Sequence, residues 1–140
     1  MADGALITGL SSAAPNLARP RIMLVDDEVD QLHLRARIIA SWGYEVVTAH
    51  DPFLAIRLAA EETWDVAVLD YEMPGMNGCV LADRLREMMP VVKIVLYSGV
   101  VAIPESDIQK VDLFISKADG VFELLRCISN LLKPVSSVNP

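Results

Sequence analysis

Carboxylate, hydroxyl and ammonium side chains lie at or just after the ends of the apolar runs in this chain. Asp26 and Asp27 follow the first run, Asp70 follows a second, Ser98 closes a third and Lys117 comes just after the last. Carboxylates supply the hard oxygen ligands that Mg²⁺ prefers, and an ammonium group can neutralise a phosphoryl oxygen. If the fold brings these ends together, the chain has the parts needed to hold a divalent metal and a phosphoryl group.

The apolar runs have the pattern of strands that are covered on both faces. They are continuous rather than alternating, and they lie at 22–25, 66–69, 94–96 and 113–115. A less uniform run at 44–47 is typical of a strand nearer an edge. Segments of helical period lie between them, at roughly 29–42, 53–62, 78–88, 105–110 and 120–132. This alternation predicts a doubly wound α/β fold with a five-stranded parallel sheet.

The carboxyl ends of the strands are where an open α/β sheet binds its ligand. Each residue taken alone also has an ordinary interpretation. Asp26 and Asp27 could cap the helix that starts near Val29, Ser98 could belong to a turn, and Lys117 could be a solvated loop residue. Their joint placement on four strand ends favours a common site.

Length and composition fit one domain with an acidic surface. The chain has 140 residues, of which 53% are hydrophobic, and its net charge is −7. That charge argues against a nucleic-acid partner, because binding to phosphates needs a surplus of Lys and Arg. Cys79 and Cys127 fall on predicted helices without metal-ligand spacing, so we expect buried thiols in a reducing compartment. No stretch is long enough to span a membrane, and we expect a cytoplasmic protein.

The two ends of the chain are expected to be flexible tails. Residues 1–20 and 134–140 are rich in Gly, Ser, Asn and Pro and cannot bury enough apolar surface to offset their chain entropy. The first segment also lacks the basic start of a secretory signal. The folded domain is therefore expected to comprise 21–133.

Four segments together resemble the receiver domain of two-component response regulators. They are Val25 to Glu28, Asp70 to Gly78 with its Met-Pro-Gly turn, Ser98-Gly99, and Lys117. The resemblance covers about 21–133 and is most specific between Asp70 and Gly78. It implies the strand order 2-1-3-4-5 and a stand-alone regulator similar to the chemotaxis type.

The resemblance also implies a role for each site residue. Asp70 would be the phosphoacceptor, receiving the phosphoryl group from a phosphohistidine of a sensor histidine kinase or phosphotransfer protein. Mg²⁺, or Mn²⁺ in its place, would be held by Asp27 and Asp70 directly, by Asp26 mainly through water, and by the backbone carbonyl of Glu72. Ser98 and Lys117 would bind the phosphoryl oxygens.

A switch is implied as well, in which Ser98 moves toward the phosphoryl group and the ring of Phe114 fills the vacated space. The signal would then pass to a protein partner, because the chain is acidic and a fourth helix of only about two turns is expected. Besides accepting and slowly losing its own phosphoryl group, the protein would not be an enzyme. Its oligomeric state is left open.

Two other functions fit parts of the same pattern. A phosphohydrolase of the haloacid dehalogenase type also uses an Asp nucleophile with Mg²⁺, but its general acid is an Asp two residues later, where this chain has Glu72. A receiver-fold interaction module that no longer depends on phosphate is the other alternative, and it usually lacks an acid or the Lys. One departure from the family pattern is that Lys117 precedes Ala118 rather than Pro.

Overall fold

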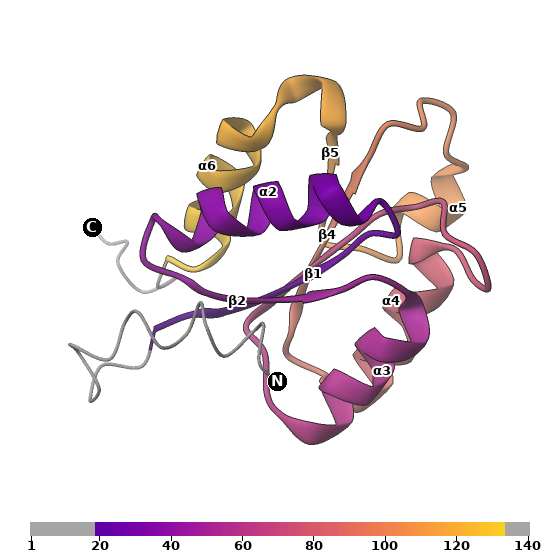
Figure 1. Cartoon of the computed structure of the whole chain (residues 1–140). Helices are drawn as coiled ribbons and strands as arrows, with labels where there is room; N and C mark the ends of the chain where they lie inside the picture. Colours follow the sequence, from indigo (N-terminus) through magenta and orange to yellow (C-terminus); the bar gives the residue numbers. More distant parts are fainter. Residues whose placement is uncertain (1–18, 134–140) are drawn as a thin grey trace, which may run out of the picture.

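The computed structural model describes residues 19–133, so the expected tails lie outside the described residues apart from Arg19 and Pro20. Strands and helices alternate along this part of the chain (Figure 1). The elements are β1 Arg21–Val25, α2 Val29–Ala40, β2 Glu45–Ala49, α3 Pro52–Glu61, β3 Val66–Leu69, α4 Gly78–Met88, β4 Lys93–Ser98, α5 Glu105–Ile108, β5 Leu113–Ser116, the 3₁₀ turn η1 Lys117–Asp119, and α6 Val121–Leu131.

The five strands form one parallel sheet in the order β2-β1-β3-β4-β5. The predicted fold class and strand order are therefore confirmed. β3 is buried at every position, as its continuous apolar sequence predicts, whereas the edge strand β2 is only partly buried. The strand order reverses between β1 and β3, which is where a doubly wound sheet opens a crevice for a ligand.

Helices cover both faces of the sheet (Figure 1). Because side chains alternate along a strand, Met23 and Val25 of β1 pack with buried residues of α3 and α4, while Ile22 and Leu24 pack with those of α2 and α6. Cys79 and Cys127 are buried on α4 and α6, as expected. In the described part of the chain, no helix is both long and apolar enough to cross a membrane.

The fourth helix along the chain is shorter than predicted. α5 has four residues, Glu105–Ile108, or about one turn, where two turns were expected. It has no buried residue, and its N-cap position Pro104 gives it no side-chain hydrogen bond. The amide of Lys110 bonds to the carbonyl of Asp107, and Asp112 then joins the sheet by bonding to Ile94. Helices in proteins are stabilised mainly by packing of an apolar face, and α5 has no buried residue, so it ends early.

Candidate functional site

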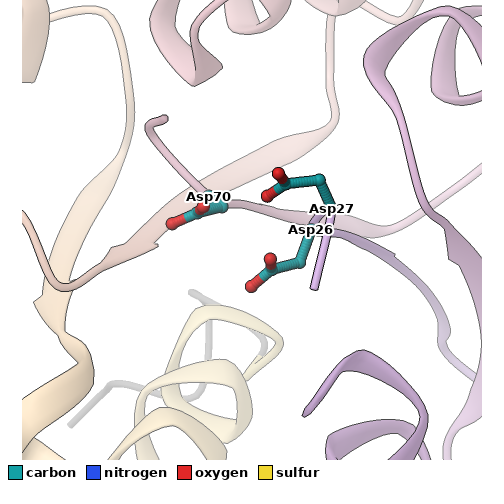
Figure 2. Close-up of side chains that lie close together, drawn as sticks. All are labelled: Asp26, Asp27 and Asp70. Atoms are coloured by element: carbon teal, nitrogen blue, oxygen red, sulfur yellow. The ribbon is translucent and has the colours of Figure 1, made fainter. Parts of the chain in front are cut away.

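The parallel register brings the ends of β1 and β3 together. Val25 pairs with Leu69, and the amide of Asp70 donates a 3.0 Å hydrogen bond to the carbonyl of Val25. Asp26 and Asp27 continue from β1 at this point, so all three acids meet at one edge of the sheet. Figure 2 shows their carboxylates close together. One oxygen from each lies within 4.8 Å of the others.

Lys117 reaches the three acids from the end of β5. Ser98 and Ser116 are the last paired residues of β4 and β5, and Lys117 follows as the first residue of η1. Its Nζ lies 2.8 Å from Oδ2 of Asp26 and 3.3 Å from Oδ1 of Asp70. Burial alone would lower the pKa of Lys117, but its hydrogen bond to Asp26 and the charge of Asp70 raise it overall. The side chain of Lys117 is therefore a cation that contacts the carboxylates of Asp26 and Asp70.

Asp70 and Asp26 are both buried, with 8% and 1% of their surfaces exposed, whereas Asp27 is exposed. Burial raises the pKa of Asp70, the charge of Asp26 raises it further, and Lys117 opposes both effects. Three carboxylates around one point repel each other, so the cluster favours a bound cation.

The residues around Asp70 form an open cleft that includes other predicted site residues. Its lining comprises Asp27, Glu28, Asp70, Tyr71, Glu72, Met73, Pro74, Asn77, Ser98, Gly99, Val100 and Lys117. Ser98 is 1% exposed, and its Oγ accepts a 3.2 Å hydrogen bond from the amide of Val100. The hydroxyl proton of Ser98 thus remains able to donate to a ligand.

The loop between Asp70 and α4 depends on its glycines. Gly75 has a φ of +97°, which favours glycine, and a Cβ at Gly78 would overlap the carbonyl oxygen of Asp70. Asn77 caps α4 by accepting hydrogen bonds from the amides of Cys79 at 2.8 Å and Val80 at 2.9 Å. These features hold the start of α4 directly against Asp70.

Phe114 lies outside the cleft lining but on the same face of the sheet as Ser98. It pairs with Leu96, two residues before Ser98, and successive side chains of a strand alternate between faces. Phe114 is partly buried against the core on the α3 and α4 side of the sheet. The Lys117-Ala118 bond that follows β5 is trans, since the described residues contain no cis peptide bond.

Arg35 is a site residue that the sequence analysis missed. Its Nη1 lies 3.3 Å from Oδ2 of Asp26, the same oxygen that Lys117 contacts. Arg35 is placed between Leu32 and Ile39, which are buried residues of α2. The sequence did contain a signal for Arg35. A basic residue that borders the apolar stripe of a predicted helix lies near the sheet, where its side chain can reach the acids.

The comparisons with known proteins agree with this geometry. The model of the response regulator receiver domain family matches residues 22–126. The response regulator receiver protein CpdR of Brucella abortus (strain 2308) is 29% identical over 115 residues, which cover 80% of this chain and 96% of CpdR. Protein-glutamate methylesterase/protein-glutamine glutaminase 1 of Anaeromyxobacter dehalogenans (strain 2CP-C) is 38% identical over 89 residues, or 64% of this chain. The match covers 25% of that longer protein.

Solved structures show the same fold. The response regulator protein TrrA of Thermotoga maritima, crystallised in complex with Mg(2+)-BeF, is 28% identical with a TM-score of 0.76, covering 81% of this chain and 99% of TrrA. TrrA has also been solved in complex with the histidine kinase ThkA. The family match extends over most of the described sheet and helices and includes the three acids, Ser98 and Lys117. This chain therefore belongs to the response regulator receiver domains of two-component signal transduction.

Proposed function

We propose that residues 21–133 act in the cytoplasm as a receiver that accepts a phosphoryl group on Asp70 from a phosphohistidine of a sensor histidine kinase or phosphotransfer protein. The observation that carries this proposal is the meeting of Asp26, Asp27, Asp70 and Lys117 at one point. All of them except the buried Asp26 line an open cleft. TrrA, a protein of similar structure, has been solved in complex with the histidine kinase ThkA, which supports the proposed kind of partner.

In the proposed reaction, a carboxylate oxygen of Asp70 attacks phosphorus as the bond from phosphorus to the histidine nitrogen breaks. The electron pair of that bond leaves with the imidazole, and an acyl phosphate forms on Asp70. Only ionised Asp70 is a nucleophile, and its burial beside Asp26 raises its pKa. Lys117 opposes this effect, because its ammonium lies 3.3 Å from Asp70. Lys117 therefore helps to keep the nucleophile charged.

The acids fit a hard divalent cation, for which Mg²⁺ is the first candidate and Mn²⁺ the second. Carboxylate oxygens are the ligands such ions prefer, and one from each of Asp26, Asp27 and Asp70 lies within 4.8 Å of the others. Both oxygens of Asp26 already accept hydrogen bonds from protein donors, which favours an indirect role for it. Asp27, Asp70 and the carbonyl of Glu72 would be the direct ligands. A bound Mg²⁺ would neutralise charge on the phosphoryl oxygens.

Ser98 and Lys117 would bind the remaining phosphoryl oxygens. The Oγ of Ser98 uses a lone pair for the amide of Val100, so its proton is available for a phosphoryl oxygen. A shift of Ser98 would change the space near Phe114, which shares its face of the sheet. We propose that this pair transmits the state of Asp70 to a surface that includes α5 and β5, where a protein partner binds. The net charge of −7 argues against nucleic acid as that partner.

Phosphorylation by a small donor tests the proposal. We expect acetyl phosphate or phosphoramidate with Mg²⁺ to add one phosphoryl group, detected by intact-mass spectrometry. Asp70→Asn should remove the label, and Glu87→Gln, which changes an exposed acid of α4, should retain it. Labelling of the Asp70→Asn variant at another residue would contradict the assignment. Sustained turnover of a phosphate monoester would instead indicate a phosphohydrolase.

A further inference from the structure

Asp26 is paired with two cations through one oxygen atom. Lys117 Nζ lies 2.8 Å from its Oδ2, and Arg35 Nη1 lies 3.3 Å from the same atom. The other oxygen, Oδ1, accepts a 2.9 Å hydrogen bond from the amide of Glu28. The side chains of Asp26 and Arg35 are only 2% and 12% exposed, so water screens this pair weakly.

Arg35 is held in place from a second direction. Its guanidinium carbon lies 5.2 Å from the centre of the Tyr97 ring, and Tyr97 is 4% exposed in the core between the sheet and α2 and α6. A guanidinium over an aromatic face is attracted to it, and the guanidinium stays charged at any ordinary pH. Arg35 is therefore a permanent positive charge whose position is fixed beside the acids.

The two cations differ in what they can do. Lys117 contacts both Asp26 and Asp70 and is 25% exposed at the cleft, so it can turn toward a phosphoryl group. Arg35 contacts the same oxygen of Asp26, but unlike Lys117 it is not among the residues that line the cleft. Its charge therefore remains beside the acid cluster whether or not the cleft is filled.

We propose that Arg35 lowers the divalent-metal affinity of the Asp26, Asp27 and Asp70 cluster. Its charge, held 3.3 Å from Oδ2 of Asp26, opposes the charge of an entering cation. The receiver thereby binds Mg²⁺ more weakly than three carboxylates with Lys117 alone would bind it. This inference rests on the proposed function, because it concerns the metal of that same site.

Calorimetric titration of the full chain with Mg²⁺ at neutral pH and fixed ionic strength tests the proposal. Arg35→Met and Arg35→Gln remove the charge, and we expect each to lower the Kd for Mg²⁺ by at least a factor on the order of five. Coulomb's law gives about that factor for one charge near a divalent ion in water, and the weak screening at this buried pair increases it. Arg35→Lys keeps the charge and should bind nearly as the wild type does. Arg37→Met is the matched control, because Arg37 is an exposed residue of the same helix.

Thermal melting in metal-free buffer shows which variants are folded, and the two neutral variants ensure that one unstable protein does not decide the result. An unchanged or higher Kd in Arg35→Met and Arg35→Gln would overturn the inference, as would an equal decrease in Arg37→Met. If the wild type binds Mg²⁺ and the Arg35 variants bind it with the same Kd, the inference about Arg35 fails and the metal site of the proposed function stands. If neither the wild type nor the Arg35 variants bind Mg²⁺, the metal site of the proposed function fails as well.

Discussion

The hydroxyl of Tyr71 donates a 2.7 Å hydrogen bond to Oδ2 of Asp107, which joins the residue after Asp70 to α5. Asp107 also accepts a contact of 3.3 Å from Sγ of Cys79 on its backbone carbonyl. α5 has only four residues and none of them is buried. Asp107 therefore attaches a helix with little packing of its own to the loop that begins at Asp70.

Loss of the Tyr71 hydroxyl should loosen α5. In Tyr71→Phe we expect the amides of 107–111, which donate the backbone hydrogen bonds of this turn, to exchange with solvent several times faster. The side-chain hydrogen bond to Asp107 is gone in this variant, while the ring remains. Native-state hydrogen exchange measures this change. Tyr44→Phe is the control, since Tyr44 packs on the α2 and α6 side of the sheet. Equal exchange of α5 in the wild type and Tyr71→Phe would show that this hydrogen bond does not hold the helix.

The same hydrogen bond predicts a pH dependence. It raises the pKa of Tyr71 to about 12, with burial adding to the effect. The usual value is 10.0, so the folded state binds this proton more tightly than the unfolded state does. The resulting stabilisation is complete below about pH 10 and is lost as the pH rises through about 12.

Tyrosinate absorbance can locate this ionisation, using Tyr71→Phe to identify the signal of Tyr71. Asp107→Asn should move the pKa of Tyr71 back toward its usual value, because it removes the charged acceptor. An ionisation of Tyr71 near its usual value in the wild type would contradict the expectation.

The sequence predicted the fold and the proximity of Asp26, Asp27, Asp70 and Lys117, because both depend on short, local patterns. Continuous apolar runs at 22–25 and 66–69 located β1 and β3, and parallel pairing then placed Asp26 beside Asp70. α5 was predicted too long because a few residues carry no usable helical period. Arg35 and the Tyr71–Asp107 bond were missed because each joins residues whose proximity depends on the packing of a helix against the sheet.

Gly78 should not tolerate a side chain. The Cβ of Gly78→Ala would overlap the carbonyl oxygen of Asp70, so either α4 or the end of β3 must shift. We expect the free energy of unfolding to fall by about 1–3 kcal/mol, as for other overpacked sites. Gly99→Ala is the control, because a Cβ there meets nothing within 4 Å, and it should change stability by less than about 0.5 kcal/mol. Equal urea denaturation midpoints for both variants would contradict this.

Mg²⁺ should stabilise the folded chain through the three acids. A ligand that binds only the folded state adds about 2.7 kcal/mol at about one hundred times its Kd, so the melting temperature should rise with Mg²⁺. Asp27→Asn should reduce that rise, because Asp27 offers one of the clustered oxygens. Asp30→Asn removes the same charge from an exposed position of α2 and should leave the rise unchanged. A melting temperature that does not respond to millimolar Mg²⁺ would argue against the site.

The final prediction separates a switch from a core residue at Phe114. A conformational equilibrium shifts only if the two states bind the ligand differently, so removing the ring should weaken the coupling between Asp70 and the α5 surface. In Phe114→Ala we expect acetyl phosphate to label Asp70 nearly as in the wild type. The phosphorylation-dependent change in amide exchange of α5 should nevertheless become smaller. Phe122 lies on α6 and is 66% exposed. Phe122→Ala therefore removes a ring from the surface and should retain the full change.

The two readouts distinguish the possible roles of Phe114. Phe114 is partly buried against the core that also contains Leu96 and Cys79, so its truncation costs some stability whichever role it has. A purely structural residue would therefore lower labelling and coupling together. A switch residue would lower the coupling alone, because Asp26, Asp70 and Lys117 are positioned by the strand ends and by their ion pairs. Parallel loss of labelling and coupling would assign Phe114 to the core and exclude it as the switch.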